Sequence, residues 1–260
     1  IAARQIANAA GGIQRIRPVR ATSRLLAIEV SVIETVEAII TSPATVALAP
    51  DELWYANART AMPGAPDHHV MFPLKWQLTR DLFEFHVAAS PDGIVWGFVP
   101  GGPAAEPSPD QAWDGGVVWP GVGLVDLPGD RTGLLYQGAP VPHKYARRPP
   151  FGKLAWAWWP KGRLAALQAP YDGSFRLHSL LFRGRTVRLN FRTRATGFVQ
   201  VAARGPGLLH DFADCDPLCG DHLDRVVSWK GRTDLGHPEG APVTLSFRLR
   251  NAELYSVRFD

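Results

Sequence analysis

The last third of the chain alternates apolar and polar residues, which is the pattern of half-buried β-strands. Turn residues separate six such stretches, and this predicts a β-sandwich of the jelly-roll type over residues 171–260. The stretches are 175–182, 186–194, 198–203, 225–230, 243–250 and 254–259. The side chains of the last two that we expect to face inward are Val243, Leu245, Phe247, Leu249, Tyr255, Val257 and Phe259.

An apolar run at 154–159 precedes this region and is too short for a helix buried on all sides. Pro160 ends the run, so we interpret it as a buried strand. Residues 161–163 then turn the chain into a second short strand at 164–167, and the two strands are expected to form a hairpin. Residues 168–173 have the composition of a loop and are the predicted boundary between two modules.

Short strands separated by Gly and Asp turns are also predicted between residues 51 and 170. They include 69–72, 82–88, 115–119, 123–127 and 132–137, with a tight turn at Asp92-Gly93. Their spacing fits roughly two repeats of about 45 residues, the size of a β-propeller blade. Two blades cannot close a ring, so this interpretation places further blades upstream in a longer protein. The predicted fold class is all-β, with partial propeller blades over 51–170 followed by the β-sandwich.

Residues 1–50 differ from the rest because they contain no Trp, Tyr or Phe. β-Branched residues are dense in 24–40, which indicates one or two strands, although a helix fits the same residues. A foreign segment joined to a genuine domain explains the composition as well. The chain begins with Ile1 rather than Met, so we expect a fragment whose full-length parent carries any export signal.

Gly and Pro account for 25 and 23 of the 260 residues, and nine Trp and twelve Phe are present. This composition is typical of an all-β protein with many turns. The net charge of +4 comes mostly from arginine and can indicate an anionic partner. However, Arg188, Arg192 and Arg194 share one face of a predicted strand, which favours a solvated face over a nucleic-acid site. No segment reaches the roughly 20 apolar residues that span a membrane.

Cys215 and Cys219 lie in a loop rich in aspartate. They can form a small disulfide in an exported protein or remain two thiols, and their spacing matches no CxxC metal site. The aspartates can bind calcium through oxygen ligands, but their spacing matches no EF-hand, and a solvated loop is the alternative. They are Asp211, Asp214, Asp216, Asp221 and Asp224.

Two polar motifs are candidate sugar-binding sites. His143, Lys144 and Tyr145 place an imidazole, a cation and an aromatic ring in three consecutive loop residues, a set suited to sugar hydroxyls and a sugar ring. Asp67 and His68 directly precede a predicted strand and can also bind hydroxyl groups. Exposed loop residues without a ligand are the alternative for both motifs.

Asp81 and Glu84 flank the start of the strand predicted at 82–88 and are the candidate catalytic carboxylates. Glycosidic hydrolysis needs one carboxylic acid to protonate the leaving oxygen and a second carboxylate as nucleophile or base. Simple edge-strand charges are the alternative. Four tryptophans can stack on sugars or pack in the core, namely Trp156, Trp158, Trp159 and Trp229.

Several longer phrases carry a resemblance to a known family. They are PDHHVMFP, AASPDGIVW, GLLYQGAPVPHKY, AWWPKGRLAAL, DCDPLCGD, RVVSWKGRTDL and PVTLSFRLRNAELYSVRF. Over about residues 54–260 the chain resembles the C-terminal half of bacterial invertase-like and arabinanase-like glycoside hydrolases. This resemblance implies a five-bladed propeller with a C-terminal β-sandwich, in a carbohydrate-active protein without an organic cofactor. Thr79-Arg80-Asp81 is similar to the Arg-Asp-Pro element of the invertase-like enzymes, with Leu82 in place of proline.

Two hypotheses for function follow. The first is glycosidic hydrolysis by the intact parent, of which this chain holds only part of the catalytic set. The alternative is a non-catalytic carbohydrate-binding or cell-surface interaction module. Two carboxylates that converge at roughly 5–5.5 Å or 6.5–9.5 Å would favour hydrolysis with retention or inversion, respectively.

Overall fold

The computed structural model describes residues 48–90, 92–108, 113–145 and 152–260, together with short strands at residues 4–8, 13–16 and 29–31. Every regular element in this part of the chain is a β-strand, so the predicted all-β fold class is confirmed. None of its sheets closes on itself, and the propeller and the jelly-roll sandwich stay predictions. Apart from residues 29–31, the strands or helix predicted for 24–40 lie outside the described residues. Within the described ranges, no helix is long and apolar enough to cross a membrane.

The chain forms two compact units whose sequence division lies between Lys161 and Gly162. The first comprises Ile1–Arg20 and Ile39–Lys161, and the second comprises Ala21–Ala38 and Gly162–Asp260. Residues 168–173, predicted as a boundary loop, instead lie inside β12 (Leu167–Leu180). A shift of pairing register between Ala169 and Asp172 accommodates the turn-forming residues without ending the strand.

The hairpin predicted for 154–167 does not form. β11 (Lys153–Pro160) pairs with β1 (Arg4–Asn8) on one side and β10 (Arg131–Ala139) on the other. Residues 164–166 form no strand, and Leu167 begins β12 in the second unit. The prediction was wrong because it assumed that consecutive strands pair, which is common but not general. The apolar run does form a strand, but its partners are the preceding strand β10 and the N-terminal strand β1, not the segment that follows it.

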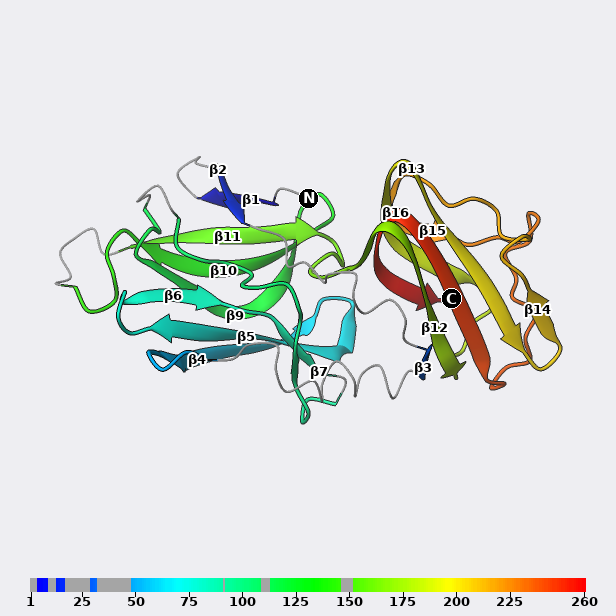
Figure 1. Cartoon of the computed structure of the whole chain (residues 1–260), viewed down its shortest axis with the longest axis horizontal. Helices are drawn as coiled ribbons and strands as arrows, with labels where there is room; N and C mark the ends of the chain where they lie inside the picture. The colour runs from blue at the N-terminus through cyan, green and yellow to red at the C-terminus, as the bar shows by residue number, and fades with distance from the viewer. Residues whose placement is uncertain are drawn as a thin grey trace. The chain divides into compact units, whose positions relative to one another are not determined.

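The described residues of the first unit form two antiparallel sheets, and β9 of one sheet contacts β4 and β6 of the other (Figure 1). One sheet has the order β2 (Ile13–Ile16), β1, β11, β10, β9 (Val117–Leu127). The other has the order β4 (Glu52–Met62), β5 (Ala65–Gln77), β7 (Ala88–Ser90), β8 (Gly97–Phe98), with β6 (Leu82–Phe85) paired to β5. The N–H of Leu124 donates to Oγ1 of Thr60 over 3.1 Å and so ties β9 to β4.

The turn predicted at Asp92-Gly93 is confirmed, and a positive φ explains its glycine. Gly93 has φ 72°, which a glycine adopts without steric cost. Oδ1 of Asp92 accepts hydrogen bonds from the N–H groups of Ile94 and Val95 over 2.8 and 2.9 Å. These bonds hold the pKa of the Asp92 carboxyl below its ordinary value. Asp92 therefore has the architectural role of a turn former.

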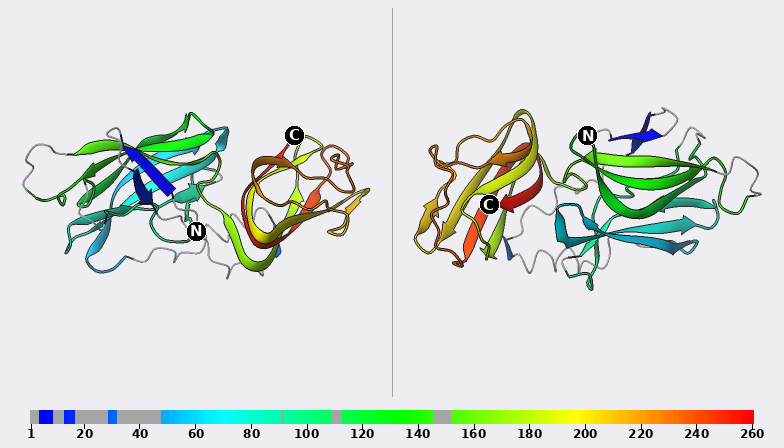
Figure 2. Two further views of the ribbon diagram at one scale, coloured as in Figure 1. Left: turned by 90° about the horizontal axis from the view of Figure 1, so that it is seen from above. Right: turned by 180° about the vertical axis from the view of Figure 1, so that it is seen from behind.

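In the second unit, two long strands replace four of the predicted short ones. The sheet has the order β14 (Leu208–His210), β13 (Val187–Gly205), β16 (Val243–Phe259), β12, β3 (Glu29–Ser31), and β15 (Asp221–Val226) also pairs with β13. β13 and β16 curve strongly (Figure 2). Thr196 and Asn251, with φ 64° and 43°, lie at a register shift between these strands. Such irregularities bend a strand without ending it.

The core of the second unit lies on the predicted inward face. Val243, Leu245, Phe247 and Leu249 are all buried, which confirms their expected orientation. Phe175 stacks on Phe247 with a centroid distance of 4.6 Å. Val257 and Phe259 pack against this core while partly exposed. Tyr255, also expected to face inward, does not join this core: it is half-buried, with its ring against the Arg163 guanidinium.

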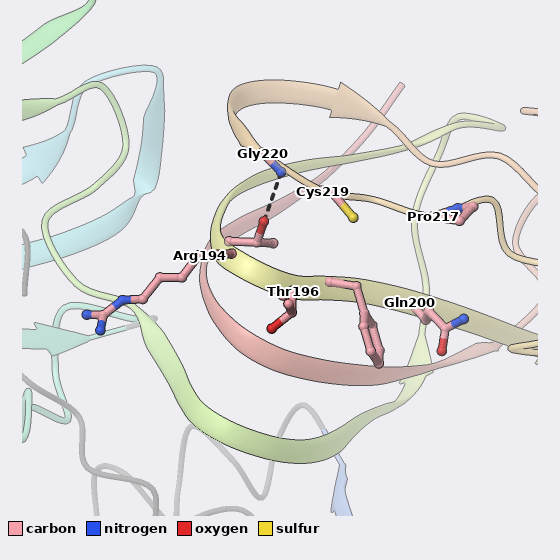
Figure 3. Close-up of a pocket in the computed structure, with 10 residues that line it drawn as sticks. Arg194, Thr196, Gln200, Pro217, Cys219 and Gly220 are labelled. Atoms are coloured by element: carbon pink, nitrogen blue, oxygen red, sulfur yellow. Dashed lines mark hydrogen bonds between the residues drawn. The ribbon is translucent and has the colours of Figure 1, made fainter.

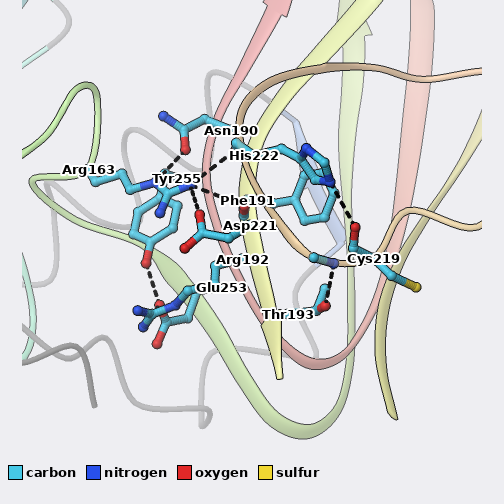
Figure 4. Close-up of polar contacts among 11 residues, drawn as sticks. Arg163, Asn190, Phe191, Arg192, Thr193, Cys219, Asp221, His222, Glu253 and Tyr255 are labelled. Atoms are coloured by element: carbon cyan, nitrogen blue, oxygen red, sulfur yellow. Dashed lines mark hydrogen bonds and ion pairs between the residues drawn. The ribbon is translucent and has the colours of Figure 1, made fainter. Parts of the chain in front are cut away.

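Arg163 is a nearly completely buried cation, with 5% of its surface exposed. Its Nε donates to Oδ1 of Asn190 over 2.7 Å, and its Nη2 donates to the carbonyls of Phe191 and His222 over 3.3 and 3.1 Å (Figure 4). Nη2 also pairs with Oδ1 of Asp221 at 2.6 Å. The guanidinium therefore links β13 to β15 just after the division between the units.

The aspartates of the acidic loop and adjoining β15 are engaged by the protein itself. Asp211 pairs with Arg204, Asp214 with Lys230, Asp221 with Arg163, and Asp224 with both Arg188 and Arg258. Asp216 accepts hydrogen bonds from the Ser228 hydroxyl and the N–H of Gly231. Among the residues that the structure describes, no three or more His, Cys, Asp or Glu are grouped so that they could hold a metal. These five aspartates therefore form ion pairs and hydrogen bonds within the protein.

The two cysteines are free thiols with different accessibility. Cys219 is exposed, whereas Cys215 is buried and its burial raises the pKa of the thiol. We expect a thiol reagent to modify Cys219 in the native protein and Cys215 only after unfolding, because the exposed thiolate is the reactive form. Thiol titration with and without denaturant measures this. Two fast thiols in the native protein, or none, would contradict the arrangement.

Candidate functional site

Asp81 lies between β5 and β6 and joins two segments of the first unit. It has φ 53°, a left-handed conformation that Asp adopts more readily than most residues. Its Oδ1 accepts a hydrogen bond from Nε1 of Trp76 over 2.9 Å, and its Oδ2 accepts one from the N–H of Lys144 over 2.5 Å. The carboxylate therefore fixes the loop that carries Lys144 to the β5–β6 hairpin.

A tight turn presents His143 and Lys144 at its two central positions. The N–H of Tyr145 donates to the carbonyl of Pro142 over 3.2 Å and closes this turn. Nζ of Lys144 lies 5.1 Å from the centroid of the Trp76 ring, within the range of a cation–π interaction. Asp81, His143 and Lys144, which the sequence placed in two separate motifs, thus meet in one place.

Four aromatic rings of the described residues surround His143. Their centroids lie 5.1 Å (Phe83), 5.4 Å (Tyr55), 5.7 Å (Trp76) and 6.1 Å (Trp119) from that of the imidazole. Nε2 of His143 also hydrogen-bonds with the Tyr55 hydroxyl at 3.2 Å. We call this set the His143 cluster, and its members are Tyr55, Trp76, Asp81, Phe83, Trp119, His143 and Lys144.

The His143 cluster has a buried base and an accessible edge. Phe83 is completely buried, Trp76 and Trp119 are half-buried, and 39% of Tyr55 is exposed. Trp76 and Phe83 face each other in the β5–β6 register and stack at a centroid distance of 5.7 Å. Tyr55 lies at a register irregularity of β4, and such positions re-aim a side chain.

Asp67 and His68 do not belong to this cluster. Both are exposed and lie near the start of β5, whereas Trp76 lies near its end. At about 3.3 Å per residue, the strand separates His68 from Trp76 by roughly 26 Å. Tyr145 adjoins the cluster through its turn, with 64% of its surface exposed. The two predicted sugar-binding motifs are therefore apart, and only the one at 143–145 joins the aromatic rings.

Glu84 faces the other side of the β5–β6 hairpin. It pairs in register with Lys75, next to the Trp76–Phe83 pair, and successive side chains of a strand point to opposite faces. Its Oε1 lies 2.7 Å from Nζ of Lys75 and 3.1 Å from Nε2 of His86. Desolvation acts to raise the pKa of Glu84, but hydrogen bonds from His86 and Lys75 outweigh it and hold the pKa below its ordinary value.

The two candidate carboxylates are thus in different surroundings. Asp81 is bonded at the edge of the His143 cluster, and Glu84 is part of an ion-pair network on the opposite face. A carboxyl kept ionised is poorly suited to protonate a leaving group. The arrangement around His143 offers half-exposed rings, an imidazole, a cation and a carboxylate, which together can bind a polyhydroxylated ring.

The four tryptophans that the sequence offered for stacking on sugars lie outside the His143 cluster and contact other parts of the protein. Trp159 and Trp229 are fully buried, and Nε1 of Trp229 donates to the carbonyl of Val201 over 2.8 Å. Trp156 and Trp158 are half-buried, and the guanidinium of Arg131 lies over the Trp158 ring at 4.9 Å. The buried pair favours the core-packing alternative over stacking on sugars.

Comparisons with known proteins add no relationship to this geometry. No family model matches the chain, and a search of curated proteins finds no significant match.

Proposed function

We propose that this protein binds carbohydrate through the His143 cluster, without hydrolysing it. The observation that carries the proposal is the grouping of Tyr55, Trp76 and Trp119 around His143, next to Asp81 and Lys144. Aromatic rings offer an apolar face for the C–H groups of a sugar, and the polar side chains offer donors and acceptors for its hydroxyls. The family resemblance points to the same class of ligand.

The positions of the carboxylates favour binding over catalysis. Glycosidases place two carboxyl groups on either side of the scissile bond. Glu84 instead faces away from the His143 cluster and is ion-paired with Lys75. Hydrolysis by a longer parent protein remains a prediction from the resemblance.

A matched pair of tyrosine variants tests the proposal. Tyr145 and Tyr171 are both highly exposed, at 64% and 83%, but only Tyr145 adjoins the His143 cluster. On a glycan array, followed by calorimetric titration of the best hit, we expect Tyr145→Ala and His143→Ala to weaken binding about tenfold or more, or 1.4 kcal/mol. Tyr171→Ala should bind like the unmodified chain.

Two outcomes would overturn the proposal. The first is the absence of glycan binding, or an equal loss in Tyr145→Ala and Tyr171→Ala. The second is turnover of chromogenic glycosides by this chain, abolished by Asp81→Asn, which would make the site catalytic. Circular dichroism of each variant verifies that the all-β fold is kept.

A further inference from the structure

A hollow lies in the second unit, and none of its lining residues belongs to the His143 cluster. It is an open, solvent-facing cavity of about 610 Å³ between the bend of β13 and the loop that leads to β15. Thr196 and Gln200 lie on the β13 side, and Pro217 and Cys219 lie on the loop side (Figure 3). This volume is within the range of small-molecule sites, roughly 300–1,000 Å³.

Backbone pairing fixes the two walls of this cavity to each other. The N–H of Thr193 donates to the carbonyl of Gly220 over 2.8 Å, and the N–H of Gly220 donates back to Oγ1 of Thr193 over 2.9 Å. Further along, the N–H of Val199 donates to the carbonyl of Leu218 over 2.9 Å. The loop is therefore held against the strand at two points, and a ligand would meet a preformed shape, which lowers the entropic cost of binding.

The side chains that line the cavity suit a neutral polar ligand with an apolar face. They carry hydroxyl, amide and thiol groups, an aromatic ring and one guanidinium group, and none of the ten lining residues is acidic. Thr196 is exposed, so its hydroxyl can donate and accept. Nε2 of Gln200 donates to the carbonyl of Phe212 over 3.4 Å, which orients the amide. Phe198 is half-buried and contributes an aromatic ring.

We propose that this cavity is a second saccharide-binding site, which takes a mono- or disaccharide. The inference rests on the proposed function for the class of ligand, but on separate residues of a separate unit. Hydroxyl and amide groups would bind the sugar hydroxyls, and Phe198 would contact an apolar face of the ring.

Cys219 provides a reporter inside the cavity. It lines the cavity and is exposed, whereas Cys215 is buried, so alkylation of the native protein reads the state of this site. The experiment follows the rate of iodoacetamide modification of Cys219 in the full chain by mass spectrometry. The probes are glucose, galactose, arabinose, fructose and their disaccharides at millimolar concentration. At a sugar concentration ten times Kd, mass action predicts about tenfold slower alkylation.

Two variants separate this site from the His143 cluster. Thr196→Val removes one hydroxyl and keeps the β-branched shape, so we expect it to reduce protection of Cys219 while the rate without sugar is unchanged. His143→Ala should leave protection intact. Failure of every sugar to protect Cys219, while glycan binding is still lost in His143→Ala, would overturn this inference and leave the proposed function standing.

The remaining outcomes are equally decisive. Protection of Cys219 without any binding that depends on His143 would support this site and overturn the proposed function. Equal protection in Thr196→Val and the unmodified chain would place the sugar elsewhere and overturn the inference. A Cys219→Trp variant, which narrows the cavity, should lose the second binding event in calorimetry, and Leu209→Trp, another exposed position of this unit, should keep it.

Discussion

Replacement of Arg163 by alanine is expected to destabilise the second unit by about 3–5 kcal/mol, the range seen when one partner of a buried charged network is removed. The guanidinium satisfies Oδ1 of Asn190 and the carbonyls of Phe191 and His222, all at 3.3 Å or less. In buried surroundings the loss of such a hydrogen bond costs about 1–3 kcal/mol for each acceptor that it leaves unsatisfied. The cation also lies 4.7 Å from the centroid of the Tyr255 ring, and this cation–π contact is lost as well.

Thiol labelling can measure this effect in the second unit alone. Both cysteines belong to this unit, and Cys215 is buried, so its pulsed labelling during a urea series reports the unfolding of that unit. The expected result is a lower urea midpoint for Arg163→Ala with an unchanged slope.

Asp221→Ala is the matched control for the ion pair with Arg163. The Asp221 side chain is 58% exposed, so its loss should cost about 1 kcal/mol or less. Arg163→Lys should recover only part of the loss, because an ammonium lacks the planar fork that reaches several acceptors. If Asp221→Ala were as damaging as Arg163→Ala, the ion pair and not the buried acceptors would hold β13 to β15.

The second unit could be predicted well from local pattern, because its core is a simple alternation. Phe247 and its apolar neighbours in β16 are buried, and Arg188 and Arg192 lie on the opposite face of β13 from Leu189 and Phe191. Local pattern failed at the bends. It divided β13 and β16 into four strands, because turn-like residues such as Asn251 stop a pattern but are accommodated in the fold by a left-handed residue and a register shift.

The candidate site, in contrast, could be predicted only in part, because it depends on contacts between segments that are far apart in the sequence. Asp81 and His143 could be selected as polar residues in loops, but their meeting depends on the hydrogen bond between Asp81 and Lys144, which are 63 residues apart. Tyr55 and Trp119 were missed because strand patterns alone do not say which faces of β4 and β9 meet. The pairing of Trp76 with Phe83 across a short hairpin was a usable local signal. Glu84 went to the other face because one residue along a strand reverses the side chain.

Removal of Lys75 should have an equally large effect in the first unit. Its Nζ lies 2.9 Å from Oε1 of Glu52 and 2.7 Å from Oε1 of Glu84, and the side chains of all three are at most 16% exposed. Lys75→Met would remove the cation shared by two neighbouring, partly buried carboxylates, of which Glu84 keeps its contact with His86, and should cost about 3 kcal/mol at neutral pH. Tryptophan fluorescence during urea unfolding measures this loss. The signal reports mainly on the first unit, because eight of the nine tryptophans belong to it and only Trp229 belongs to the second.

The pH dependence of this loss distinguishes electrostatics from packing. In the unmodified chain the pKa of Glu84 lies below its ordinary value of 4.5, so its contribution is present above that value and is lost as the pH falls through the lowered pKa. Without Lys75, desolvation and the nearby Glu52 should raise the pKa of Glu84 relative to the unmodified chain. The difference in stability between the two proteins should therefore be largest at neutral pH and shrink on acidification. Lys75→Met combined with Glu84→Gln removes the titrating charge and should recover much of the stability, whereas a pH-independent loss that the double variant retains would assign Lys75 a packing role.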